Sequence, residues 1–122
     1  MESKKVLSIE DNTANRKIIF DLLTSQGYNV VEACDGKEGL KKAKTENPAV
    51  ILLDIQLPEM DGYQVMKALA ADSLTQNIPV IILSSYAMPG DSEKGYAAGA
   101  SAYLTKPYNF AELLDSIKKA LA

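Results

Sequence analysis

The 122-residue chain contains no histidine, and this absence removes several kinds of chemistry at once. A histidine general base, a Ser-His-Asp triad and a histidine metal ligand are all impossible. No phosphohistidine can form on the chain either. The single cysteine, Cys34, cannot form an internal disulfide, and one thiol without histidine cannot build a zinc site. We therefore expect Cys34 to be a buried residue with no chemical role.

Long apolar runs are also missing. Each apolar stretch is interrupted after a few residues by a charge or a proline, and the N-terminus (MESKKVLSIED) lacks the apolar core of a signal peptide. We expect a cytoplasmic protein without a membrane partner. The net charge is −3 and lysines are scattered along the predicted helices, which argues against direct binding of nucleic acid.

What the chain does contain is a regular alternation of short apolar runs with helical patterns, in a composition that is 47% hydrophobic and 24% charged. We predict one domain over residues 1–122. The predicted strands lie near 4–9, 29–33, 49–54, 79–84 and 101–105, and the predicted helices near 13–26, 36–46, 61–72, 90–98 and 109–121.

The alternation predicts an α/β fold with right-handed crossovers onto a parallel sheet. Three of the strands are near-continuous Val/Ile/Leu runs, as expected when helices cover both faces of the sheet. Helix signals agree, with Gly27 after the first helix, Pro48 after the second, and Asn109 with Glu112 opening the last as in a capping box. We expect a three-layer, doubly wound (βα)5 domain of the flavodoxin-like type, with strand order 2-1-3-4-5.

Polar residues close four of the five predicted strands. Glu10 and Asp11 follow the first strand, Asp54 closes the third, Ser84 closes the fourth and Lys106 follows the fifth. Because the carboxyl ends of parallel strands meet at one edge, we expect these side chains to converge on one pocket.

Three carboxylates at close range repel one another, by about 4 kcal/mol for each close pair at an effective dielectric of 20. Lys106 supplies one compensating charge, and a hard divalent cation such as Mg²⁺ would supply the rest. Beside Mg²⁺, Asp54 could attack a phosphoryl group, with Asp11 as metal ligand and Glu10 behind it through water. Ser84 and Lys106 could then hold phosphoryl oxygens. The alternative is that Glu10 and Asp11 merely cap the first helix and Asp54 is an incidental loop charge.

The sequence closely resembles the receiver domain of two-component response regulators over essentially its whole length. It is most similar to the stand-alone, DivK-like regulators and to the receiver modules of hybrid kinases. The stretches that carry the resemblance are IED (Ile9 to Asp11), LLDIQLPEMDG (Leu52 to Gly62), VIILSSYAM (Val80 to Met88) and AYLTKP (Ala102 to Pro107).

The resemblance implies a phosphoacceptor signalling domain rather than a conventional enzyme. It would take a phosphoryl group from a phosphohistidine on a histidine kinase or phosphotransfer protein, lose it slowly, and signal to a downstream protein target through the surface of the fourth helix, fifth strand and fifth helix. The implied site consists of Asp54 as phosphoacceptor, Glu10 and Asp11 as the acidic pair, the Gln56 backbone carbonyl as a Mg²⁺ ligand, Ser84 as switch hydroxyl, Tyr103 as switch aromatic and Lys106 as the phosphoryl-binding lysine. It also implies a cis Lys106-Pro107 bond.

Further features qualify this picture. Ser84 stands where threonine is commoner; it keeps the hydroxyl, so signalling should survive. Tyr86 is bulky enough to hinder a hydrolytic water, so we predict a comparatively long-lived phosphoryl group on Asp54. The segment from Pro89 to Ala100 holds three glycines, which predicts that the fourth helix is the loosest. Tyr103 could instead be plain core packing.

For the partner, Asn15, Arg16 and Ile18 could form an exposed docking face on the first helix, whereas Ile19, Leu22 and Leu23 are expected in the core.

Three other functions share parts of this pattern. A flavodoxin-like FMN carrier would need a hydroxyl- and glycine-rich loop where this chain has EDNTAN, and a haloacid-dehalogenase-type phosphatase would need an aspartate at position 56, which is glutamine. A phosphorylation-independent pseudo-receiver would have no reason to keep Asp54 and Lys106 together. The sequence leaves open whether the domain is a stand-alone regulator or a module of a longer chain.

Overall fold

The computed structural model describes residues 4–57, 59–85, 88 and 90–122, and in it five parallel strands form one sheet in the order β2-β1-β3-β4-β5. The strands are β1 (Lys5–Ile9), β2 (Asn29–Ala33), β3 (Val50–Asp54), β4 (Val80–Ser84) and β5 (Ala102–Thr105). The helices are α1 (Thr13–Ser25), α2 (Gly36–Glu46), α3 (Gly62–Ala71), α4 (Asp91–Ala97) and α5 (Phe110–Leu121). The predicted fold class, strand order and alternation of elements are confirmed.

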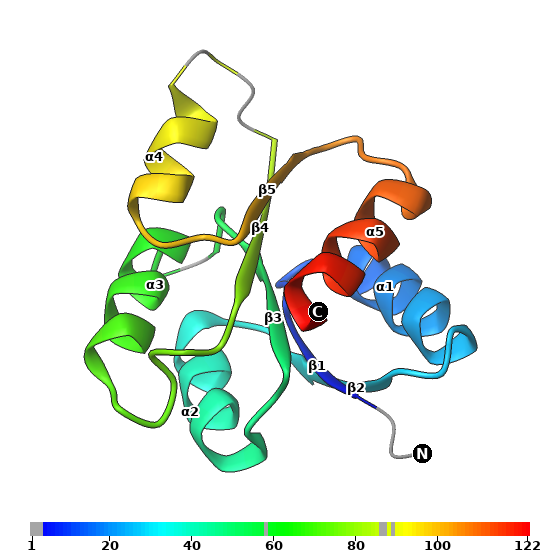
Figure 1. Cartoon of the computed structure of the whole chain (residues 1–122), viewed down its shortest axis with the longest axis horizontal. Coiled ribbons are helices and arrows are strands. Elements are labelled where there is room, and N and C mark those ends of the chain that lie inside the picture. Colours follow the sequence, from blue (N-terminus) through cyan, green and yellow to red (C-terminus); the bar gives the residue numbers. More distant parts are fainter. Residues whose placement is uncertain (1–3, 58, 86–87, 89) are drawn as a thin grey trace.

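The helices cover both faces of the sheet. Figure 1 shows α1 and α5 on one side of the strands and α2, α3 and α4 on the other. Side chains alternate along each strand, so that Val6 joins the core cluster beneath α1 and α5 while Leu7 joins the cluster beneath α2 and α3. Since both faces are covered, β3 and β4 are buried at every position.

Short polar side chains cap the N-termini of α1, α2, α3 and α5. Asp35 accepts a hydrogen bond from the Glu38 backbone N–H, and Gly27 adopts the left-handed conformation (φ 90°) just beyond α1. At α5 the capping box is only half formed. Asn109 accepts from the Glu112 backbone N–H, but the Glu112 carboxylate bonds the Asn109 side-chain amide rather than its backbone.

The fourth helix begins at Asp91 and ends at Ala97, within one residue of the predicted range 90–98 at each end. Gly90 precedes it with φ 94° and offers no side chain to cap the exposed N–H groups. Its greater looseness stays a prediction.

The expectation that Cys34 is buried is wrong, because this thiol is exposed. Cys34 lies one residue beyond β2, an edge strand, where the chain leaves the sheet for the loop before α2.

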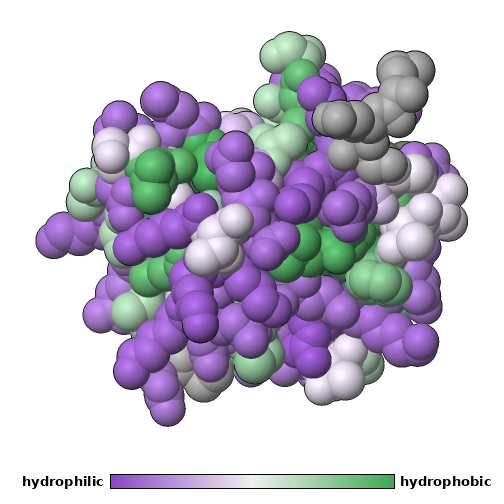
Figure 2. Space-filling model, turned by 90° about the horizontal axis from the view of Figure 1, so that it is seen from below, coloured by the Kyte–Doolittle hydropathy of each residue, from purple (hydrophilic) through white to green (hydrophobic). Residues whose placement is uncertain are grey.

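Hydrophilic residues cover most of the face shown in Figure 2, where hydrophobic residues form separate groups. In the described ranges, no helix combines the length and apolar character needed to cross a bilayer.

Candidate functional site

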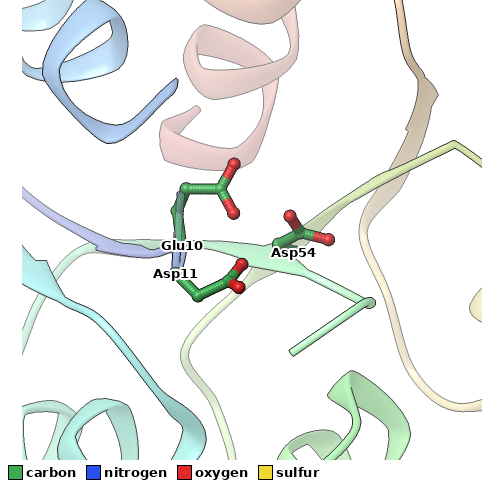
Figure 3. A group of neighbouring side chains, drawn as sticks. All are labelled: Glu10, Asp11 and Asp54. Atoms are coloured by element: carbon green, nitrogen blue, oxygen red, sulfur yellow. The ribbon is translucent and has the colours of Figure 1, made fainter. Parts of the chain in front are cut away.

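Three carboxylates meet at the carboxyl edge of the sheet. Glu10 and Asp11 follow β1 and Asp54 ends β3. Because Ile9 pairs with Leu53 in the parallel register, Glu10 and Asp54 lie at the same level of neighbouring strands. Each of the three carboxylates offers one oxygen within 4.8 Å of the others. Figure 3 shows the group side by side at the ends of these two strands.

Lys106 joins the group from the loop after β5. Its Nζ donates to Asp54 Oδ2 at 2.8 Å and lies 3.5 Å from Glu10 Oε1. Its side chain is 23% exposed, whereas Glu10 and Asp54 are almost wholly buried, so the ion pair is shielded on its acidic side. Lys106 therefore contacts two of the three clustered carboxyl groups.

The carboxyl groups of Glu10 and Asp54 respond to this crowding in opposite ways. Burial and the neighbouring Asp54 carboxylate raise the pKa of Glu10 to about 7. Burial by itself would raise the pKa of Asp54, but hydrogen bonds from Glu10, Lys106 and the Gln56 backbone hold it below its usual value. Asp54 is therefore the ionised member of the pair, and Glu10 is the member that takes up a proton as the pH falls through about 7.

Burial by itself would lower the pKa of Lys106, but its bonds to Asp54 and Glu10 raise it instead. The lysine therefore stays charged at neutral pH and supplies a fixed positive end to the site.

The loop after β3 fixes the second oxygen of Asp54. The Gln56 backbone N–H donates to Asp54 Oδ1 at 2.8 Å, and the Gln56 side-chain oxygen accepts from the Ser85 backbone N–H at 3.2 Å. These two bonds tie the β3–α3 loop to the β4–α4 loop above Asp54. The Gln56 backbone carbonyl as a metal ligand stays a prediction.

Ser84 ends β4, as the strand pattern predicts, and Tyr103 lies on β5. Ser84 is fully buried at the end of β4, one residue beyond Leu83, which pairs with Asp54 in the register. The Lys106 backbone N–H donates to the Ser84 carbonyl at 2.7 Å. This bond holds the backbones that carry the hydroxyl and the lysine next to each other. Tyr103, on β5, is partly buried against the α2/α3/α4 core cluster, and its switch role and its packing role both remain open. The Lys106-Pro107 bond is cis, as expected.

The alternative that Glu10 and Asp11 serve as helix caps does not fit the geometry. Asn12 is the N-cap of α1, and its side chain accepts from the Asn15 backbone N–H at 2.9 Å. Glu10 is instead buried beside Lys106.

The residues present fit a hard divalent cation. Carboxylate oxygens are the ligands that Mg²⁺ prefers. Within the described residues, Glu10 Oε2 is buried without a hydrogen-bond partner, which costs free energy unless a ligand or water reaches it. The charge imbalance and this unsatisfied oxygen both favour a bound cation.

A surface hollow of about 530 Å³ opens beside Lys106. Its walls come from α1 and from the loop that leads into α5, and the residues that line it are Asn15, Ile18, Ile19, Ser85, Lys106, Pro107, Tyr108 and Phe110. Ile18 is 48% exposed and Phe110 is 49% exposed, so exposed apolar side chains line the hollow together with the charged Lys106. Ile19 and Leu23 are buried and Leu22 is partly buried, as the sequence suggested.

Arg16 is the residue whose role the sequence reasoning missed. It is partly buried rather than exposed, and it donates to the Glu10 backbone carbonyl at 2.8 Å. The available signal was position, since Arg16 lies one helical turn after the Asn12 cap and faces back toward the acidic pair.

Known proteins resemble this chain throughout its length. A model of the response regulator receiver domain family matches residues 6–118. The polar-differentiation response regulator DivK of Brucella ovis is 39% identical over 119 residues, covering 98% of this chain and 97% of that protein.

Two solved structures share the fold at 32% identity. The chemotaxis response regulator CheY4 of Vibrio cholerae superimposes with a TM-score of 0.91, covering 98% of this chain and 100% of that one. The receiver domain of the sensor histidine kinase PA1611 from Pseudomonas aeruginosa has a TM-score of 0.90 with 98% of both chains covered, and it holds a magnesium ion in its active-site cleft.

Proposed function

Because the chain belongs to the response regulator receiver family of two-component systems, we propose that Asp54 accepts a phosphoryl group from a phosphohistidine on a partner protein in a Mg²⁺-dependent reaction. The observation that carries the proposal is the convergence of Glu10, Asp11 and Asp54 with Lys106 at one edge of the sheet. We take residues 1–122 as one receiver domain located in the cytoplasm.

Asp54 acts as the nucleophile. Its depressed pKa keeps the carboxylate ionised at neutral pH, and its position at the end of a fully buried strand holds it rigidly. One of its oxygens forms a bond to phosphorus while the phosphorus–nitrogen bond of the partner's phosphohistidine breaks. The imidazole leaves with the bonding electron pair, and the product on this chain is an acyl phosphate.

Glu10, Asp11, Asp54 and the Gln56 backbone carbonyl are the groups that would hold Mg²⁺. When bound, the ion neutralises charge on the transferring phosphoryl oxygens. The magnesium in the PA1611 receiver domain supports this assignment, as does the unsatisfied oxygen of Glu10.

Lys106 and Ser84 would bind the other phosphoryl oxygens. The Lys106 ammonium already lies 2.8 Å from Asp54 Oδ2, so a phosphoryl group on Asp54 would be within its reach. Ser84 would donate its hydroxyl from the end of the neighbouring strand.

The structural change that follows phosphorylation would reach the downstream surface through β5. Phosphorylation adds nearly two negative charges beside Ser84, and the β4–β5 pairing links that residue to the strand that carries Tyr103. A second hollow of about 470 Å³ lies between α4, β5 and α5 and includes Tyr96, Tyr103 and Lys119. A change in the position of Tyr103 would reshape this surface for a downstream protein target.

The phosphoryl donor would dock at the hollow beside α1. Ile18 and Phe110 are exposed apolar residues that line this hollow together with Lys106. A histidine kinase or a histidine phosphotransfer protein could place its phosphohistidine against Asp54 from this side. The predicted long life of the phosphoryl group rests on Tyr86, which lies outside the described residues, and it stays a prediction.

Acetyl phosphate with Mg²⁺, followed by intact mass measurement, tests the proposal. We expect one phosphoryl adduct on the wild-type chain and none on Asp54→Asn. Asp115→Asn removes an exposed carboxylate on α5 and should leave the adduct unchanged. An absent adduct on the wild type, or an equal adduct on Asp54→Asn, would reject Asp54 as the acceptor.

A further inference from the structure

We propose that Arg16 is a positioning residue that holds the backbone of the Glu10–Asp11 turn in the conformation needed to bind magnesium. The inference rests on the proposed function, because it concerns the same metal site. It assigns to α1 a task beyond contact with a partner protein.

The guanidinium of Arg16, on the helix that follows the Glu10–Asp11 turn, contacts backbone carbonyls of that turn. Its Nη1 donates to the Glu10 carbonyl at 2.8 Å and lies 3.5 Å from the Asp11 carbonyl. The Arg16 backbone N–H bonds the Asn12 carbonyl at 2.9 Å, so the residue belongs to the first turn of α1. The side chain therefore folds back from a fixed helix onto the segment that precedes it.

The guanidinium also contacts β2. Arg16 Nε lies 3.4 Å from Glu32 Oε2, and Glu32 pairs with Ser8 in the β1–β2 register. The Arg16 side chain is only 19% exposed. The planar fork of arginine can donate in two directions at once, whereas a lysine ammonium acts as a point charge. Arg16 thus connects α1, β2 and the acidic turn.

The acidic turn needs such support because its two side chains go to different environments. Glu10 is buried and Asp11 is exposed, yet each must keep an oxygen within 4.8 Å of the other and of Asp54. A small rotation of the backbone between them would separate these oxygens. Groups that orient metal ligands commonly change metal affinity by about tenfold or more when they are removed.

Electrostatics alone predicts the opposite effect, and this makes the inference testable. Arg16 is a cation next to an acidic cluster, so its charge opposes the binding of Mg²⁺. Removing only the charge would strengthen Mg²⁺ binding. Removing a positioning contact would weaken it.

Calorimetric titration of the whole chain with MgCl₂ separates the two effects. We expect Arg16→Gln to raise the dissociation constant about fivefold to tenfold. Arg16→Lys keeps the positive charge but loses the planar guanidinium, and it should also raise the Mg²⁺ dissociation constant severalfold. The matched control is Lys17→Gln, which removes a positive charge from an exposed side chain on the same helix and should change the constant by less than about twofold.

Far-UV circular dichroism and urea unfolding on each variant report folding separately from metal affinity. If Arg16→Gln does not fold, Arg16→Lys decides the question, because its net charge equals that of the wild type. Equal or tighter Mg²⁺ binding by a folded Arg16→Lys or Arg16→Gln variant would overturn the inference. So would an unfolded Arg16→Lys variant, since Arg16 would then serve the fold as a whole.

The two proposals fail in distinguishable ways. If the wild type neither binds Mg²⁺ nor accepts a phosphoryl group from acetyl phosphate, the proposed function fails. If the wild type does both and the Arg16 variants bind Mg²⁺ as the wild type does, only the role of Arg16 is lost.

Discussion

At the scale of single residues, the central feature is a pair of neighbouring carboxyl groups in different protonation states. Burial and the Asp54 charge raise the pKa of Glu10 to about 7, while the bonds around Asp54 lower its own pKa. Lys106 contacts both. Below about pH 7 the pair therefore holds one proton and one negative charge, and a cation that binds there must compete with that proton.

The first prediction concerns the pH dependence of Mg²⁺ binding. Since the pKa of Glu10 is raised, its carboxyl group is protonated below about pH 7 and ionised above it. Mg²⁺ favours the ionised form, so its affinity should fall as the pH falls through about 7, and binding at about pH 6 should release up to one proton. Calorimetry in buffers of different ionisation enthalpy measures that proton.

Glu10→Gln is the control for this pH dependence, because it removes the proton while keeping the side-chain shape. Its Mg²⁺ affinity should be lower and nearly independent of pH above about pH 6. A wild-type affinity that is constant between about pH 6 and pH 8 would contradict the assignment to Glu10.

The second prediction concerns Lys106 and stability. Lys106→Met leaves the Asp54 charge without its partner, so we expect the free energy of unfolding in metal-free buffer at pH 8 to fall by about 1–3 kcal/mol. Lys119→Met removes a 79%-exposed lysine that pairs with Asp115 and should cost less than about 0.5 kcal/mol. Urea unfolding measures both. Equal losses in the two variants would contradict this prediction, because the Lys106 pair would then stabilise the fold no more than an exposed pair does.

Sequence reasoning brought Glu10, Asp11, Asp54 and Lys106 together because strand ends in a parallel sheet have predictable positions. It did not find the contacts of Arg16, because the direction of a long side chain at a helix start depends on tertiary packing. The exposure of Cys34 was missed for another reason: this small apolar residue lies just past β2, and the sequence pattern did not show that the surroundings of an edge strand leave it exposed.

At the scale of elements, two helices begin with glycine directly after an aspartate cap. Gly36 opens α2 after Asp35, and Gly62 opens α3 after Asp61. A Cβ on Gly62 would lie 2.6 Å from the Ile55 backbone, whereas a Cβ on Gly36 would meet the end of the Met60 side chain at 2.9 Å. The Gly62 contact lies next to Asp54 and cannot relax without moving the backbone.

The third prediction uses this matched pair. Gly62→Ala should lower the free energy of unfolding by about 1–3 kcal/mol and reduce the rate of phosphorylation by acetyl phosphate, because the Ile55 backbone must shift beside Asp54. Gly36→Ala should cost clearly less, since the Met60 thioether is flexible and alanine favours the helix. Urea unfolding and the mass assay measure both variants. The reasoning is wrong if Gly36→Ala proves the more damaging change.

The elements themselves were largely predictable from sequence. Apolar runs of strand length and signals such as Gly27, Pro48 and Asn109 located the strands and helices to within one or two residues. The capping box of Asp61 and Gln64 at α3 was not foreseen. Even the fourth helix, whose N-cap Gly90 gives no side-chain signal, was located to within one residue at each end.

At the scale of the whole molecule, the parallel sheet is what assembles the site. Residues that are far apart in the sequence, such as Glu10 and Lys106, come within 3.5 Å because every strand runs in the same direction. Each of the two core clusters contributes to holding β1 and β3 in place. A ligand at the edge therefore bridges strands and should stabilise the entire fold.

The fourth prediction is that Mg²⁺ raises the free energy of unfolding of the whole chain. At a free concentration of 100 times its dissociation constant, the gain should be about 2.7 kcal/mol for a single site. Urea unfolding at pH 8 with MgCl₂, against KCl at equal ionic strength, measures it. Asp11→Asn should show a much smaller gain. An equal gain in KCl would mean that general screening of charge is responsible.

The exposure of Cys34 has a practical consequence. The chain has one cysteine and no tryptophan, so a maleimide fluorophore would attach at a single point and report without intrinsic indole background. Since a hydrogen bond with Glu38 raises the pKa of the Cys34 thiol, labelling should proceed faster in mildly alkaline buffer. The unaltered chain thus offers a single labelling site at Cys34, from which a fluorophore could report structural changes in real time one strand away from Glu10.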